Sequence, residues 1–174
     1  MIYYNKMSNI KSMFMFTDGK KVYSKYNKLY KKHKKGYVIL GPPGIGKTTF
    51  VRNQLGKKKD WIDQDDLFNE LRVKWHMNKN NDNELKLNYL RADYMSEQSK
   101  MLGYRIIGSL FWEYIPDAIV IPPLELHEKY IKKRKDLVYE DVINIRKFLF
   151  KHAKKHKIPI FDKIIDSTKY LENL

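Results

Sequence analysis

A short glycine-rich stretch restricts the fold of this chain more than any other feature of its sequence, and it reads Gly41-Pro42-Pro43-Gly44-Ile45-Gly46-Lys47-Thr48. It matches the pattern G-x-x-x-x-G-K-[ST] at every fixed position. The apolar run Tyr37–Leu40 comes directly before it, and residues 48–55 after it have helical character that stops at Gly56. A buried strand that leads through a glycine-rich turn into a helix predicts an α/β fold with a parallel sheet.

The residue types in this turn suit the binding of phosphate groups, as in the Walker A motif. Gly44 and Gly46 let the backbone curl around an anion where side chains would clash. Pro42 and Pro43 have no N–H, so the donors come from about Gly44 onward, and the positive end of the following helix adds to them. The expected nucleotide-binding residues are Gly41, Gly44, Ile45, Gly46, Lys47, Thr48 and Thr49.

Two side chains of the turn have expected roles in chemistry. We expect Lys47 to reach the β- and γ-phosphates of ATP and the hydroxyl of Thr48 to ligate Mg²⁺.

The rest of the chain alternates between strand and helix patterns. Further strands are expected at 61–62, 104–110, 118–121 and 164–165. Helices are expected within 67–102, where an Asn-rich patch at 78–83 interrupts them, and at 124–134 and 140–156. This alternation predicts a parallel sheet with helices on both faces.

The first 35 residues are expected to form an N-terminal extension to a domain that covers 36–174. Apolar residues at helical spacing predict an amphipathic helix over 17–35, which a lysine-rich run and Gly36 would end.

Composition limits where the protein works and what it binds. The chain has 174 residues and no cysteine, so it forms no disulfide, which suits a reducing cytoplasm. No apolar run approaches the ~18 residues that span a bilayer, so we expect a soluble cytoplasmic protein without membrane contact. A formal net charge of +15 has three open explanations: a nucleic-acid partner, an anionic substrate, or a coding sequence rich in A and T.

A second motif, Trp61-Ile62-Asp63-Gln64-Asp65-Asp66-Leu67, follows the glycine-rich turn. Together the two motifs resemble the P-loop kinase group that holds nucleoside monophosphate kinases, shikimate and gluconate kinases, and polynucleotide kinases. The resemblance covers roughly 37–174 and implies a single P-loop NTPase domain. Such a domain has a parallel sheet of about five strands in the order 2-3-1-4-5, binds ATP with Mg²⁺, and transfers a phosphoryl group.

The resemblance also implies roles for the two aspartates. In shikimate- and gluconate-kinase-like enzymes the second strand ends in a D-x-D pattern, which Asp63 and Asp65 match. In polynucleotide kinases a carboxylate at the position of Asp65 acts on the attacking hydroxyl. Asp65 is therefore expected to be catalytic and to face the acceptor, and Asp63 to lie beside the metal. The structural alternative is that Asp65 and Asp66 cap the next helix.

Two departures from the group's pattern bear on these roles. Polynucleotide kinases usually have an arginine three residues beyond that aspartate, where this chain has Phe68. The end of the third strand, 105–110, has no Walker B aspartate. This absence strengthens the expectation that Asp63 is the acidic neighbour of the metal.

The later segments supply candidate cations. In the group, the fourth strand leads to a lid, placed here at 125–140, whose cations clamp the transferring phosphoryl group. Arg134 is the first choice for this catalytic role and Lys133 the second, with a solvated basic face as the alternative. Residues 164–168 resemble the segment beside the adenine, although Ser167 and Thr168 could instead cap the last helix.

Residues 67–102 occupy the place of the group's acceptor-binding helices. Arg72 and Arg91 are candidates for an acceptor phosphate. Trp75, Tyr89 and Tyr94 could stack on a base or belong to the core.

Three functions therefore compete. The first is an ATP-dependent kinase for a small acceptor, with a nucleoside monophosphate preferred. The second is a polynucleotide 5′-hydroxyl kinase. The third is a P-loop NTPase or nucleotide-dependent nucleic-acid-binding module without kinase activity.

Overall fold

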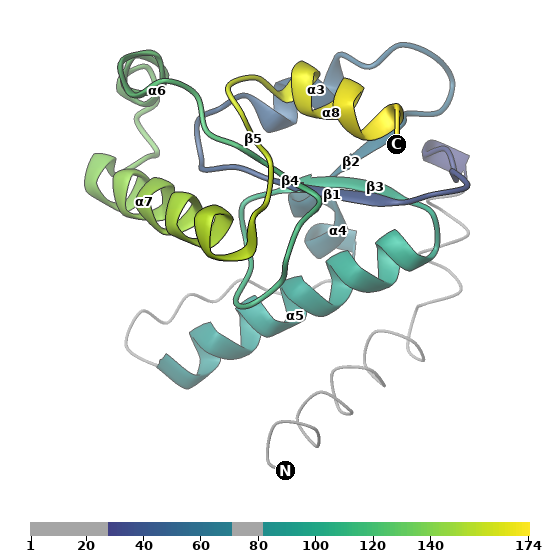
Figure 1. Ribbon diagram of the computed structural model, residues 1–174, viewed down its shortest axis with the longest axis horizontal. Coiled ribbons are helices and arrows are strands. Elements are labelled where there is room, and N and C mark those ends of the chain that lie inside the picture. The colour runs from purple at the N-terminus through teal and green to yellow at the C-terminus, as the bar shows by residue number, and fades with distance from the viewer. Residues whose placement is uncertain (1–27, 71–81) are drawn as a thin grey trace.

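The computed structural model describes residues 28–70 and 82–174, and its centre is a parallel sheet of five strands (Figure 1). The strands are β1 (Tyr37–Leu40), β2 (Trp61–Asp63), β3 (Arg105–Gly108), β4 (Ala118–Val120) and β5 (Ile160–Phe161). They lie in the order β2-β3-β1-β4-β5. The prediction of a five-stranded parallel α/β sheet with the order 2-3-1-4-5 is confirmed.

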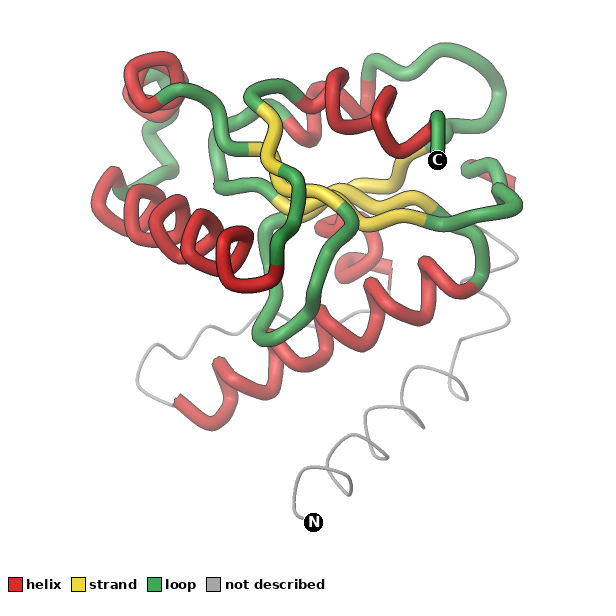
Figure 2. The backbone as a smooth tube through the Cα atoms, in the orientation of Figure 1, coloured by secondary structure: helices red, strands yellow, loops and turns green. Residues whose placement is uncertain are grey.

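Six helices of the described chain pack around this sheet (Figure 2). They are α3 (Lys47–Arg52), α4 (Gln64–Glu70), α5 (Asp82–Met101), α6 (Leu124–Lys132), α7 (Tyr139–His156) and α8 (Ile164–Glu172). None of the helices in the described part of the chain is both long and apolar enough to cross a bilayer.

The central strand is buried on both faces because its side chains alternate between two cores. Val38 and Leu40 belong to a core completed by α4, α5 and α7, whereas Tyr37 and Ile39 belong to a second core completed by α3 and α8. Figure 1 shows α3 and α8 on one side of the sheet and α4 and α5 on the other. Because β1 pairs with β3 on one side and β4 on the other, the turn that follows β1 lies near the middle of the sheet's carboxyl edge.

The fifth strand lies at Ile160–Phe161, so its predicted position at 164–165 is wrong. Ile164 and Ile165 instead begin α8, in which Ile164, Ser167, Thr168 and Leu171 form a buried stripe at helical spacing. The pair Ile164-Ile165 is typical of a strand, but the buried residues of this segment recur at helical spacing, and the segment forms a helix.

The predicted helix over 17–35 lies outside the described residues up to residue 27. Lys28 and Leu29 are helical, and the prediction is wrong for residues 30–35. Tyr30 is a buried core residue that forms a parallel bridge with Lys59, and the N–H of His33 donates to the carbonyl of Gly103 at 2.8 Å. Gly36 does not stop a helix. A Cβ at Gly36 would lie 2.2 Å from the carbonyl oxygen of Lys100, so glycine permits close contact with the end of α5.

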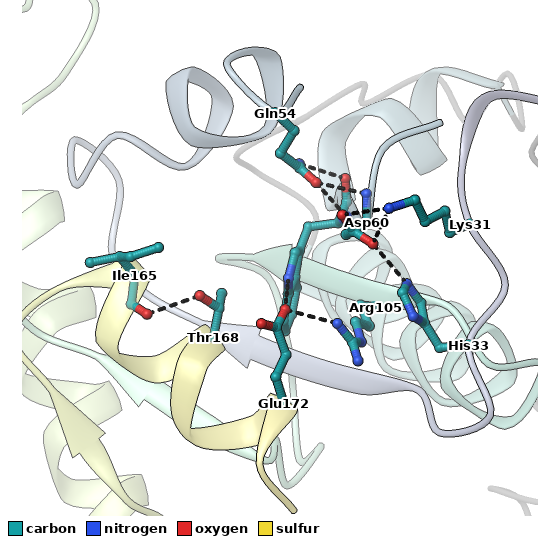
Figure 3. Close-up of polar contacts among 9 residues, drawn as sticks. Lys31, His33, Gln54, Asp60, Arg105, Ile165, Thr168 and Glu172 are labelled. Carbon is teal, nitrogen blue, oxygen red and sulfur yellow. Dashed lines mark hydrogen bonds and ion pairs between the residues drawn. The ribbon is translucent and has the colours of Figure 1, made fainter. Parts of the chain in front are cut away.

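A polar network fixes the segment that enters β2 (Figure 3). The carboxylate of Asp60 accepts a hydrogen bond from Lys31 at 3.2 Å and lies 3.5 Å from the His33 ring. The side-chain amide of Gln54 bonds both the N–H and the carbonyl of Trp61, at 2.8 and 3.1 Å. These contacts align β2 with the end of α3, and so they help to position the carboxylates that follow β2.

Candidate functional site

The glycine-rich turn connects the carboxyl end of β1 to the first turn of α3. Gly44 and Gly46 have φ angles of +87° and +88°, in the left-handed region that favours glycine, and Gly46 is the N-cap of α3. The N–H of Gly41 donates to the carbonyl of Gly108 at 2.9 Å, which ties the start of the turn to β3. The turn thus uses left-handed glycines at the two positions where the sequence predicts that the backbone curls.

Lys47 folds back over the turn. Its Nζ donates to the carbonyl oxygens of Gly41 at 3.1 Å and Pro42 at 2.8 Å. Burial lowers the pKa of Lys47 to about 8, whereas the nearby carboxylates Asp65 and Asp63 act to raise it. The two carboxylates therefore act to keep the Lys47 ammonium group protonated, against the effect of its burial.

His127 of α6 makes a hydrogen bond to the backbone of the turn. The fully buried ring places Nε2 2.8 Å from the carbonyl oxygen of Pro43, so Nε2 carries the proton and donates. Burial lowers the pKa of His127 and favours this neutral form. A Cβ added to Gly44 would come within 3.6 Å of His127 Nε2 and 3.4 Å of the Leu137 side chain, so α6 and the loop after it pack closely on the turn.

Asp63 and Asp65 lie where β2 passes into α4. Asp63 is only 3% exposed, and its Oδ1 accepts the N–H of Asp65 at 3.1 Å. Asp63 is therefore the residue that caps the start of α4, while Asp65 and Asp66 lie within its first turn. The alternative in which Asp65 and Asp66 cap this helix is wrong, because both lie inside it and the capping oxygen belongs to Asp63.

The pKa of Asp65 is raised, first by desolvation in the surrounding protein and then by repulsion from Asp63, while Lys47 acts in the opposite direction. A carboxylate with a raised pKa is a better proton acceptor than an ordinary aspartate. Asp65 therefore has the electrostatic setting of a general base.

Gln64, between the two aspartates, makes hydrogen bonds to the backbone that follows β3. It was not identified from the sequence. Its fully buried Oε1 accepts the N–H groups of Ser109 at 3.1 Å and Leu110 at 3.0 Å, and its Nε2 donates to the carbonyl of Leu110 and to Ser96 Oγ. A Cβ on Gly108 would lie 2.1 Å from this Oε1. The amide of Gln64 thus occupies the region beyond β3, where the sequence has no Walker B aspartate.

Two of the residues expected beside a magnesium ion, Thr48 and Asp63, carry oxygen atoms of the kind that this ion binds. Mg²⁺ commonly takes one or two protein oxygens and fills its remaining positions with phosphate oxygens and water. Thr48, exposed in the first turn of α3, and Asp63 supply such oxygens. Within the described residues there is no group of three or more His, Asp or Glu side chains that would hold a metal by themselves.

Arg134 follows α6 and is half exposed. Its guanidinium bonds both carboxylate oxygens of Asp136, with Nε 3.0 Å from Oδ1. Its positive charge also acts to lower the pKa of Lys47, so the two cations influence one another across the turn. The neighbouring Lys133 is exposed at the end of α6.

The other candidates fall into different places. Arg91 is half buried on α5, whereas Arg72 and Trp75 lie outside the described residues. Tyr94 belongs to the core, and the ring centroid of Tyr89 lies 6.2 Å from that of Trp112.

The hydroxyls of Ser167 and Thr168 do not cap α8. They donate to the carbonyls of Ile164 and Ile165, at 2.7 and 3.0 Å (Figure 3 shows the second bond).

Comparison with known proteins adds no relative. No protein-family model matches the chain, and no curated protein is significantly similar to it in sequence.

Proposed function

We propose that this chain is an ATP-dependent phosphotransferase of the P-loop kinase type, which binds ATP with Mg²⁺ at the turn 41–48. The observation that carries the proposal is a left-handed glycine turn after β1, whose Lys47 folds back onto the carbonyls of Gly41 and Pro42. The negative charges of Asp65 and Asp63, which follow β2 at the same edge of the sheet, act to raise the pKa of this lysine. Ligand sites in open parallel sheets lie at this edge.

Nucleotide binding would change the partners of Lys47. Its Nζ bonds the carbonyls of Gly41 and Pro42. Phosphate oxygens are stronger partners for an ammonium group than neutral carbonyls are. The N–H groups from about Gly44 to Thr49 and the amino end of α3 would complete the cradle. Thr48 and Asp63 would hold the Mg²⁺ ion, which neutralises phosphate charge.

In the transfer step, an oxygen of the acceptor forms a bond to the γ-phosphorus, and the bond from that phosphorus to the β–γ bridging oxygen breaks, which releases ADP. Arg134 would stabilise the charge on the transferring group after exchanging Asp136 for phosphate oxygens. Arg91, and Arg72 outside the described residues, would bind an acceptor phosphate. We propose a nucleoside monophosphate as the first candidate for the acceptor.

A specific observation favours a second acceptor class. Asp65 is set up to take a proton, and a hydroxyl acceptor loses one during transfer, whereas the phosphate of a nucleoside monophosphate has none to lose at neutral pH. A 5′-hydroxyl polynucleotide is therefore the second candidate.

Transfer of the labelled γ-phosphate of ATP in the presence of Mg²⁺ tests the proposal. The acceptors are nucleoside monophosphates, a 5′-hydroxyl oligonucleotide, small hydroxylated metabolites and water alone. We expect label on one acceptor, loss of transfer in Lys47→Ala, and unchanged transfer in Lys57→Ala, which removes an exposed lysine from a loop. Label released only to water would instead identify an NTPase, and wild-type turnover in Lys47→Ala would refute the assignment of the turn.

A further inference from the structure

The long helix α7 has its charges divided along its length. Its acidic residues, Glu140 and Asp141, lie in the first turn. From residue 142 to residue 161 the chain has no Asp or Glu, but it has Arg146 and five lysines. A helix that is merely solvated usually mixes both signs of charge, so this segregation calls for an anionic partner.

The lysines of α7 form a row on its exposed side. Val142, Leu149 and Ala153 are the buried residues that face the core. Lys147, Lys151 and Lys155 are all exposed, and they lie on the opposite side of the helix. The helical rise of ~1.5 Å per residue spaces them by about 6 Å along the axis. No ion pair within the described part of the chain involves any of these three lysines.

Two exposed aromatic rings flank this row. Phe148 is 52% exposed and Phe150 is 42% exposed, and the 100° turn per residue places them on either side of Lys151. The Phe148 ring packs against Phe111, with centroids 5.4 Å apart, which holds it in place. The ammonium group of Lys154 lies 4.5 Å from the centroid of the Phe150 ring. Two large apolar rings beside a row of cations offer stacking surfaces next to phosphate-binding groups.

We propose that this surface, the α7 lysine face formed by Lys147, Lys151, Lys155, Phe148 and Phe150, binds single-stranded nucleic acid. The lysines contact successive phosphates, and the two rings stack on unpaired bases. Stacking of this kind favours a single strand, because the bases of a duplex are already stacked on each other. The proposal goes beyond phosphoryl transfer and does not depend on it, since none of these five residues belongs to the turn 41–48.

The test measures binding of a fluorescently labelled single-stranded oligothymidylate to the full chain by polarisation, over a range of NaCl concentrations. The triple variant Lys147→Ala, Lys151→Ala, Lys155→Ala should weaken binding at least about tenfold near 0.1 M salt and reduce the salt slope by about two, since each lost phosphate contact removes about 0.7. The matched control is Lys57→Ala, Lys58→Ala, Lys169→Ala, which loses the same charge from other exposed positions and should change affinity less than about threefold.

Phe150→Ala, and separately Phe148→Leu, should weaken binding about fivefold or more while leaving the salt slope unchanged, because stacking releases no counterions. Thermal unfolding of every variant checks that the fold is retained. Lys47→Ala should bind the oligonucleotide like the wild type, which separates this surface from the nucleotide site.

Three results would overturn the proposal. Equal losses in the two triple variants would show that affinity follows net charge alone. A duplex that binds as tightly as the single strand, with no effect of the Phe substitutions, would remove the role of the rings. Binding to phosphatidylserine vesicles without binding to the oligonucleotide would identify a membrane surface as the partner.

Discussion

Lys47 is the residue whose charge state most directly affects the proposed nucleotide site. Its pKa is lowered to about 8, so the free protein loses the ammonium charge as the pH rises through about 8. Because only the protonated form pairs with phosphate, the affinity for ATP should be constant below this pH. It should fall above it by up to about tenfold per pH unit, until the pKa of the nucleotide-bound form is reached.

Isothermal titration calorimetry with ATP and Mg²⁺ at about pH 7, 8 and 9 measures this dependence. Lys47→Ala serves as the control, since its weaker binding should lack the loss of affinity above about pH 8. Equal wild-type affinities at the lowest and highest pH would show that phosphate binding does not use the Lys47 charge.

Asp65 is expected to act on the chemical step rather than on nucleotide binding. With a hydroxyl acceptor, removing its charge in Asp65→Asn should lower turnover by about 100-fold or more, the usual range for loss of a general base, while the ATP dissociation constant changes less than about threefold. Steady-state transfer assays and calorimetry measure the two quantities. The neighbouring substitution Asp66→Asn is the matched control, and it should retain most of the activity. Equal losses of turnover and of ATP affinity would indicate that Asp65 has a structural role.

At the residue scale, sequence reasoning identified the turn and the aspartates because both have short, local signatures. His127 and Gln64 have no such signature. His127 meets Pro43 across 84 positions of the chain and Gln64 meets Leu110 across 46, so these partners exist only once the sheet has formed. In a single sequence, an Asn, Gln or His that makes a hydrogen bond to a turn far away in the chain looks the same as one exposed on the surface.

At the scale of elements, the strongly apolar strands were predictable and the marginal ones were not. β1 is a continuous apolar run between Gly36 and Gly41, and it lies where the sequence placed it. β5 has only two residues, Ile160 and Phe161, and Pro159 directly before them weakens the strand signal of this short apolar run. Residues 30–35 belong to the predicted helix because Tyr30 continues the helical spacing of apolar residues before it, but Tyr30 instead forms a bridge with Lys59.

The junction of β2, α4, β3 and α5 depends on one side-chain amide. Gln64→Ala would leave the partly buried N–H groups of Ser109 and Leu110 without their acceptor and would remove a fully buried side chain, so we expect the free energy of unfolding to fall by about 2–4 kcal/mol. Urea unfolding followed by circular dichroism measures the change. Gln98→Ala, at a partly exposed position of α5, should cost less than about 1 kcal/mol. A loss in Gln64→Ala no larger than in this control would contradict the role of the amide.

At the scale of the whole molecule, the net charge of +15 opposes compaction. Screening by salt should therefore stabilise the fold, and Tm should rise by a few degrees between about 0.02 and 0.3 M NaCl. Differential scanning calorimetry measures the shift. The variant Lys57→Glu, Lys58→Glu, Lys169→Glu lowers the net charge at exposed positions and should show a smaller rise. A Tm that is flat or falls with NaCl would mean that self-repulsion is negligible.

The contacts of Gln54 have a consequence for many copies of the chain at high concentration. An outer strand normally leaves backbone donors and acceptors open, and these can template the growth of a sheet between molecules. Here the side-chain amide of Gln54 makes hydrogen bonds to both the N–H and the carbonyl of Trp61. The N–H and the carbonyl of Lys59 are bonded to the backbone of Leu29 and Lys31. The opposite margin, β5, is too short to recruit a foreign strand. We therefore expect the β2 edge to resist pairing with a strand of another molecule at Trp61, where the Gln54 amide makes the hydrogen bonds that a sixth strand would otherwise make.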